Sequence, residues 1–436
     1  MQHSHEALDR PGGLSSVNLF TPLRNRDFRL LWTGMSVSLI GDGIFLVAMA
    51  WQAYVLWNAP FALSLVGLGL TVPMLIFLLP SGVVSDRYDR RLVMLGSDAV
   101  RAVAVGLIAV LALTSTLELW HLVALVALYG VGTAFFTPAF DAVVPDLLPD
   151  GDLPAANSLD QFVRPIALRL VGPAVGGWLV AVDTGVAFAV DAATFVVSMA
   201  MVLAMRPPPR PWRDATTPAV TAMVEGLRFV RGRVWLWGTL GSAAVTYLVF
   251  LGPAEVLLPY VVKNDLHASA GVLGLVFAAG GVGAVGSALI MGQRAEPRRN
   301  VTFMYACWTV ATLAVAGYGI ATSAWQLMAA CLLFNALETA GTIVWATIKQ
   351  RHVPAEMLGR VSSLDWLISI GLLPLSFVLT APVAGAIGAQ ATLVGAALIG
   401  GATTLVALFL PGMRDIEREA QSTAASRAPR ASASRA

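Results

Sequence analysis

The sequence predicts an all-α membrane protein with twelve transmembrane helices arranged in two similar halves. Of its 436 residues, 57% are apolar and only 12% are charged, and the mean hydropathy is +0.74. A soluble globular domain carries about a quarter charged residues, so this composition indicates a chain that lies in lipid. At about 20 residues per crossing, twelve apolar runs are each long enough to span a bilayer as a helix.

The expected spans divide the chain into five parts. A polar N-terminal arm, residues 1–27, precedes a first six-helix half, 28–205. A linker, 206–233, with an amphipathic helix suited to the membrane surface, leads into a second half, 234–411. A tail rich in Ala, Ser and Arg, residues 412–436, has no apolar period and is expected to be disordered. The expected spans are residues 30–55, 62–84, 92–114, 120–143, 157–181, 185–205, 234–258, 270–292, 301–321, 325–348, 361–383 and 389–410.

The positive charges indicate how the chain is oriented. With the N-terminus inside, 24 of the 28 Lys and Arg residues fall in cytoplasmic segments. One, Lys263, falls in an exterior loop, and Arg101, Arg164 and Arg169 lie within spans. Because cytoplasmic loops carry the excess of basic residues, we expect a multi-pass protein of the bacterial inner membrane with both termini in the cytoplasm. The N-terminal arm lacks the apolar segment of a signal peptide.

A charged turn connects the second and third spans. It contains Gly82, Asp86, Arg87, Arg90 and Arg91, in the pattern G-x-x-x-D-R-x-x-R-R. We expect Gly82 to supply a flexible entry to a short loop, and Asp86 to accept N–H groups at a nearby helix start. The arginines are compatible with two roles, a topology anchor and a set of gate contacts.

Ionisable residues inside the spans are the main candidates for a functional site. Asp42, between Gly41 and Gly43, lies about 12 residues into a helix that rises 1.5 Å per residue, so it is expected near the middle of the bilayer. A carboxylate there is costly unless it faces a cavity, is protonated or is paired. We therefore expect a proton-binding or cation-recognising site; the alternative is a carboxylate that caps a helix broken at the glycines. Asp98 and Arg101, three residues apart on one helix face, form a pair by spacing alone.

Three further residues are candidates for the proton or substrate site. Glu338 lies deep in the tenth span, and the same cost argument applies to it. Glu255 is expected either to line an outer vestibule or to reach water. Arg101 and Arg164 are expected to balance the buried acids. The walls of a substrate pocket are sought among Phe45, Met49, Trp51 and Trp345, which are equally compatible with facing lipid.

The fifth span carries a cluster of small residues around a proline. Gly172, Pro173, Gly176 and Gly177 allow close approach of a neighbouring helix, and Pro173 is expected to bend its own helix. Helix packing alone also explains such a cluster. Val-Pro and Ser-Leu-Asp segments before the fifth span recur before the eleventh, which predicts two homologous halves.

These motifs resemble those of the major facilitator superfamily of transporters over nearly the whole chain, from Phe28 to about Pro411. The loop from Gly82 to Arg91 is similar to its signature loop, and the resemblance implies that these charges, with Asp98, belong to a cytoplasmic gate. The GPxxGG sequence from Gly172 resembles its antiporter motif, which is associated with export. Taken together, these motifs are most similar to those of the bacterial branch of drug, macrolide and siderophore exporters. What the resemblance implies is the major facilitator fold, a monomer, and rocker-switch alternating access.

The energy source is inferred from what the sequence lacks. It contains no G-x-x-x-x-G-K-[ST] motif for ATP, no metal-ligand cluster and no nucleophile-base spacing, so we expect no enzyme and no cofactor. An ion gradient remains as the energy source. The buried acids favour the proton as the coupling ion, and we expect it to compete with an amphipathic substrate at Asp42. Two alternatives stay open: import of a small anionic metabolite with Arg101 and Arg164 as ligands, and a non-transporting receptor or scaffold. Cys307 and Cys331 are expected to be packing residues.

Overall fold

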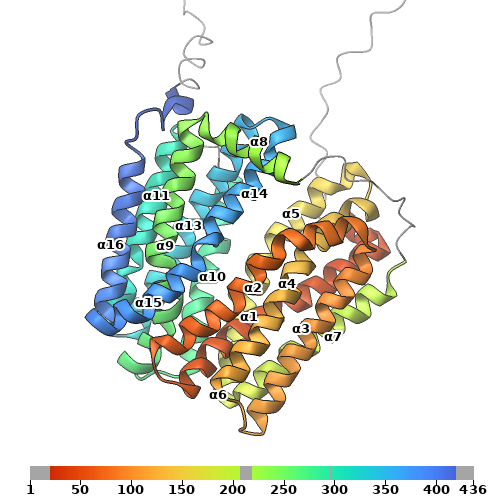
Figure 1. Ribbon diagram of the computed structural model, residues 1–436, viewed down its shortest axis with the longest axis vertical. Coiled ribbons are helices and arrows are strands. Elements are labelled where there is room, and N and C mark those ends of the chain that lie inside the picture. Colours follow the sequence, from red (N-terminus) through yellow and green to blue (C-terminus); the bar gives the residue numbers. More distant parts are fainter. Residues whose placement is uncertain (1–19, 207–218, 295–296, 419–436) are drawn as a thin grey trace, which may run out of the picture.

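In the computed structural model, all regular structure within the described residues, 20–206, 219–294 and 297–418, is helical. Twelve helical stretches are long and apolar enough to cross a membrane, which confirms the predicted number of spans. Figure 1 shows the helices of the first half (red to yellow-green) packed beside those of the second half (green to blue).

The first half contains α1 (Arg26–Leu56), α2 (Pro60–Arg87), α3 (Arg90–Leu113), α4 (Leu119–Leu147), α5 (Leu153–Arg164), η3 (Pro165–Val171), α6 (Gly172–Val182) and α7 (Thr184–Ala204). Helix α8 (Ala219–Arg231) precedes the second half, as the amphipathic linker predicted. The second half contains α9 (Val234–Tyr260), η4 (Val261–Asp265), α10 (Ala270–Gln293), α11 (Asn300–Ala314), α12 (Ala316–Ile320), α13 (Ala324–His352), α14 (Ala355–Gly371), α15 (Leu373–Ile387) and α16 (Ala389–Ala407).

The two halves repeat the same packing. In the first half α1 and α3 pack on α7, and α2 packs on α4. The corresponding spans of the second half do the same: α9 and α11 pack on α16, and α10 packs on α13. The structure therefore has the pseudo-symmetric pair of six-span halves that the sequence repeat predicts.

The fifth span differs from a regular bent helix. It consists of α5, a π-helical stretch at η3, and α6, and Pro173 lies in the first turn of α6 rather than at a mid-helix bend. A proline donates no N–H, so the carbonyl four residues before it, that of Arg169, loses its usual partner. A π segment is one way in which a helix absorbs such a defect, and these segments are frequent at functional sites.

The turn between α2 and α3 corrects two expectations. Gly82 lies inside α2, not in a loop, and the connection is only Tyr88 and Asp89. The N-cap of α3 is Asp89, whose carboxylate accepts the N–H of Arg91 at 2.9 Å, in place of the predicted Asp86. The helix continues through Gly82 although Pro80, two residues earlier, donates no backbone N–H, and it ends where Asp89 caps the start of a new helix.

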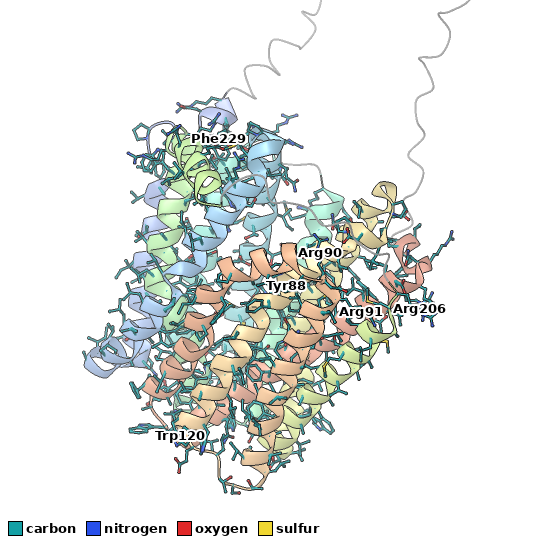
Figure 2. The ribbon with its side chains drawn as sticks, turned by 45° about the vertical axis from the view of Figure 1, so that its right-hand side comes forward. Tyr88, Arg90, Arg91, Trp120, Arg206 and Phe229 are labelled. Atoms are coloured by element: carbon teal, nitrogen blue, oxygen red, sulfur yellow. The ribbon has the colours of Figure 1, made fainter. Side chains whose placement is uncertain are left out.

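The buried core shows where the halves adhere. One hydrophobic cluster joins them and includes Tyr54 and Phe188 of the first half with Leu257 and Phe377 of the second. It lies toward the predicted extracellular end. At the other end each half has its own cluster, around Phe140 in the first half and Trp235 in the second. Figure 2 shows Trp120 near the predicted extracellular end and Phe229 at the opposite, predicted cytoplasmic end.

Candidate functional site

Asp42 lies in the middle of α1 and is held by residues of two other helices. One carboxylate oxygen accepts the Tyr129 hydroxyl of α4 at 2.6 Å, and the other lies 3.9 Å from a guanidinium nitrogen of Arg101 on α3. Helix α1 is continuous through Gly41 and Gly43, so the alternative of a carboxylate capping a broken helix is wrong. Instead the glycines bring neighbours close: a Cβ at Gly43 would stand 2.8 Å from the Cα of Gly172.

Arg101 is the centre of this network. Its side chain is only 3% exposed and forms an ion pair with Asp98, one turn earlier on α3. The other oxygen of Asp98 accepts the Ser198 hydroxyl at 2.7 Å. The guanidinium also lies over the rings of Phe136 and Phe195, at 4.4 and 4.5 Å from their centroids. The pair that spacing predicted therefore exists, and aromatic faces fix the arginine in place.

Asp191 of α7 adds a third carboxyl group. It is fully buried, and its charge interacts with those of Asp42 and Arg101. One oxygen lies 3.4 Å from the Thr194 hydroxyl, and the other accepts no hydrogen bond from the described part of the chain. Two carboxyl groups thus lie within 4 Å of one enclosed guanidinium, and the charge of a third, that of Asp191, acts on it. We name Asp42, Asp98, Asp191, Arg101 and Tyr129 the Arg101 network.

A separate ionic contact, outside the Arg101 network, joins the two halves. Arg169, in the π-helical stretch η3, lies 3.8 Å from Glu338 of α13 and 3.3 Å from the side-chain oxygen of Asn335. Glu255 of α9 is exposed, and the charge of Arg169 acts on it as well. Arg164 has a different partner, since it forms an ion pair at 2.8 Å with Asp160 one turn earlier. Its charge still acts on Asp42 from that position.

A pocket opens inside the second half, between α9, α11, α13 and α16. Its walls are mainly the aromatic side chains of Tyr247, Phe250, Tyr305, Trp308 and Phe334, and Glu338 lines it as well. The predicted wall residues are elsewhere. Phe45, Met49 and Trp345 are buried among other side chains and face neither a cavity nor lipid, because their helices are covered on that side.

The basic residues at the start of α3 contact their own half. Arg90 donates to Asp146 of α4 at 2.8 Å, and the Nε of Arg91 donates to the carbonyl of Val202 in α7 at 2.8 Å. The side chains of Asp86 and Arg87 lie outside the described part of the structure. The predicted gate contacts with the second half stay a prediction.

The opposite end carries contacts between the halves. The Tyr54 hydroxyl donates to the Val256 carbonyl at 2.5 Å, and the side chains of Asn58 and Asn264 are 2.6 Å apart. Lys263, the one basic residue predicted in an exterior loop, donates to the Tyr54 carbonyl. These contacts close the halves together at the predicted extracellular end.

The glycines of the predicted antiporter motif lie on two faces of α6. Gly172 and Gly176 face α1, where their Cβ atoms would stand 2.7 and 2.9 Å from the Cα atoms of Gly43 and Ile44. Gly177 faces the second half, where a Cβ would stand 2.8 Å from the Cα of Gly274 on α10. The motif therefore packs its own half together and also forms part of the seam between the halves.

Sequence reasoning found Asp42, Asp98, Arg101 and Glu338 but assigned no role to Tyr129, Asp191, Arg169 or Asn335. The signal for Asp191 and Arg169 was present, because a charge within a span is functional by default. Tyr129 and Asn335 carried no comparable signal. No group of three or more His, Cys, Asp and Glu side chains among the described residues is placed to hold a metal ion.

Comparisons with known proteins agree with this architecture. Residues 17–433 match the model of a family described as transmembrane secretion effector. The chain is 30% identical over 395 residues to the multidrug efflux pump Tap of Mycolicibacterium fortuitum, covering 86% of this chain and 94% of that protein. It is 24% identical over 366 residues to the macrolide efflux protein A of Streptococcus pyogenes, covering 83% and 90%. The solved structure of a bacterial homologue of the iron transporter ferroportin, in an inward-facing state, superposes with a TM-score of 0.65 at 15% identity, covering 88% and 99%.

Twelve spans in two repeated halves, together with the family match and the relatives, define a multi-pass transporter of the major facilitator superfamily, and not an enzyme. Within that superfamily, the chain belongs to the transmembrane secretion effector family.

Proposed function

We propose that this protein exports amphipathic small molecules, drugs and antibiotics among them, in exchange for protons by alternating access. The relatives named multidrug and macrolide efflux proteins support the direction and the substrate class. The observation that carries the proton coupling is the Arg101 network, and the arrangement of the halves supports alternating access.

The Arg101 network is suited to hold and release a proton. If Asp42, Asp98 and Asp191 were all ionised around the single guanidinium of Arg101, the network would carry a net negative charge within the hydrocarbon region. Such a charge costs several kcal/mol of desolvation that its partners do not repay. A proton bound to one carboxyl group lowers this cost. Asp42 is the best placed to exchange it, since its side chain is 15% exposed whereas those of Asp98 and Asp191 are fully buried.

The conformation supports the cytoplasm-facing state of such a cycle. Contacts between the halves gather at the predicted extracellular end, through Tyr54, Lys263 and the seam at Gly177. At the other end each half has a separate hydrophobic cluster. A substrate would reach the region between the halves from the cytoplasm or the inner leaflet. After the halves had tilted the other way, a proton would bind from outside.

The import of a small anion is less well supported. Its expected ligands were Arg101 and Arg164. Arg101 is enclosed and committed to carboxylates, and Arg164 is paired with Asp160. The guanidinium of Arg101 is not available to an anion in this conformation, and that of Arg164 would first have to leave Asp160.

The test is drug accumulation in an efflux-deficient bacterium that expresses the wild type, Asp42→Asn or Asp415→Asn. Asp415 is an exposed acid beyond α16, paired with Arg418, and serves as the matched control. Wild type and Asp415→Asn should lower the accumulation of a macrolide or ethidium only while the proton gradient stands. Asp42→Asn should not, at equal membrane abundance. Efflux that survives a protonophore, or full activity in Asp42→Asn, would contradict the proposal.

A further inference from the structure

The pocket in the second half has aromatic walls and a single charged group. Phe250 meets Tyr247 and Phe334 with ring centroids 5.9 Å apart, and Tyr305 meets Trp308 at 6.0 Å. Among the described residues that line the pocket, Glu338 alone carries a charge.

The hydroxyl groups in the wall add little polarity. Thr239 donates to the carbonyl of Trp235 at 2.7 Å, and Thr312 to that of Trp308 at 2.9 Å. Thr404 is bonded to the carbonyl of Gly400 at 3.0 Å in the same way. Because these three hydroxyls are used within their own helices, the pocket presents mainly ring faces and methyl groups, together with the Ser242 side chain and one carboxylate.

The carboxylate of Glu338 is only loosely neutralised. One oxygen accepts the Thr342 hydroxyl at 3.0 Å, and the other lies 3.8 Å from Arg169 of the first half. The Arg169 side chain is 50% exposed. A long ion pair with one partner half in solvent contributes little net stability, so another cation can replace Arg169 without a large loss.

We propose that this pocket binds an organic cation that carries an aromatic or alkylammonium group, and that the cation takes the place of Arg169 at Glu338. Ring faces attract such cations through their quadrupoles, and a nearby carboxylate supplies the counter-charge. Arg169 belongs to the first half and Glu338 to the second. Binding therefore removes an ionic contact between the halves, which links occupancy of the pocket to the freedom of the halves to move.

The binding step can be tested on the purified full-length protein. The probes are (3-hydroxyphenyl)trimethylammonium and its neutral isostere 3-tert-butylphenol, which have nearly the same shape and differ in charge. Titration calorimetry should show that wild type binds the neutral compound about tenfold more weakly than the cation. Glu338→Gln should reduce this preference to the part that the ring faces supply, and the control Asp415→Asn should retain it in full.

Arg169→Gln makes the test specific. If Arg169 competes with the ligand, its removal should tighten binding of the cation by about threefold and leave the neutral compound unchanged. Ala243→Leu, which narrows the pocket without touching either charge, should weaken both probes. Equal affinity for both probes in the wild type, or unchanged or weaker binding of the cation in Arg169→Gln, would overturn the inference. Arg169→Gln and Ala243→Leu keep the test valid if Glu338→Gln does not fold.

The export role of this site rests on the proposed function, but the binding experiment does not. Binding as expected without proton-dependent efflux would leave the cation site standing and refute the exporter. Proton-dependent efflux with no preference for the cation would leave the exporter standing and refute the cation site.

Discussion

In the proposed alternating-access cycle, Gly274→Ala should shift the protein away from the cytoplasm-facing state. Gly274 of α10 packs against α6 of the other half, in the seam at the predicted extracellular end. A Cβ there would stand 2.5 Å from the carbonyl oxygen of Pro173 and 2.7 Å from the Cα of Gly177. Ordinary contact begins at 3.4 Å, so the two helices must separate by about 0.9 Å to admit the methyl group.

The size of the shift follows from the cost of overpacking. An extra methyl group in a close-packed site costs about 1–3 kcal/mol. In the proposed cycle this cost applies only while the seam is closed, because the two halves would part at this end in the outward-facing state. The equilibrium between the two states should therefore move toward the outward-facing state by a factor of about 5–150.

The assay is a distance measurement between spin labels at that end. Trp120 of the first half and Trp325 of the second are 62% and 67% exposed, and both can be changed to Cys for labelling. The buried Cys307 and Cys331 are first changed to Ala. In Gly274→Ala, a population with a longer distance between the labels should appear or grow.

Gly286→Ala is the matched control. It lies on the same helix and gains the same helix propensity, but its Cβ would meet nothing within 4 Å. If the distance distributions of the two variants coincide, the seam at Gly274 does not distinguish the states and the reasoning fails.

Three other perturbations test the remaining contacts. The native side chains of Asn58 and Asn264 are 2.6 Å apart, so a disulfide between Asn58→Cys and Asn264→Cys should stop export until it is reduced. Export by the cross-linked protein would refute the need for this end to open. Tyr129→Phe removes a donor to an enclosed carboxyl group, worth about 1–3 kcal/mol, and should slow export about tenfold at unchanged abundance, so an unchanged rate would count against the Arg101 network. Gly172→Ala places a methyl group 2.7 Å from the backbone of α1 and should lower the midpoint of thermal unfolding, whereas Gly96→Ala, with open space around it, should not.

The sequence predicted the spans well because the membrane restricts the choices. Lipid offers no hydrogen bonds, so apolar runs of this length must be helices. Most predicted ends lie within four residues of the observed ones, but the seventh span runs to Asp265 rather than to residue 258. Local expectations at the turn after α2 were less successful. A glycine and a charge cluster suggested a loop from Gly82 onward, but the helix continues to Arg87 because α2 can satisfy its backbone there.

The same restriction predicted part of the site. A charge in the hydrocarbon region is costly whichever way its helix is rotated about its axis. Asp42, Asp98, Arg101 and Glu338 could therefore be selected one by one. Which charge meets which could not be predicted, except for the pair one turn apart on α3. Arg169 and not Arg164 is the arginine that faces Glu338.

By itself, the sequence determined that the chain crosses the membrane twelve times in two related halves, and which residues would be costly to bury. Only the tertiary structure decided that Asp191 and Tyr129 join the Arg101 network, that Gly177 forms a seam with Gly274, and that the aromatic pocket lies inside the second half. The physical reason is that these helices are apolar on nearly all sides. Their rotation and neighbours are set by the packing of small residues and by ion pairs between distant segments, and no periodicity in a single helix encodes either.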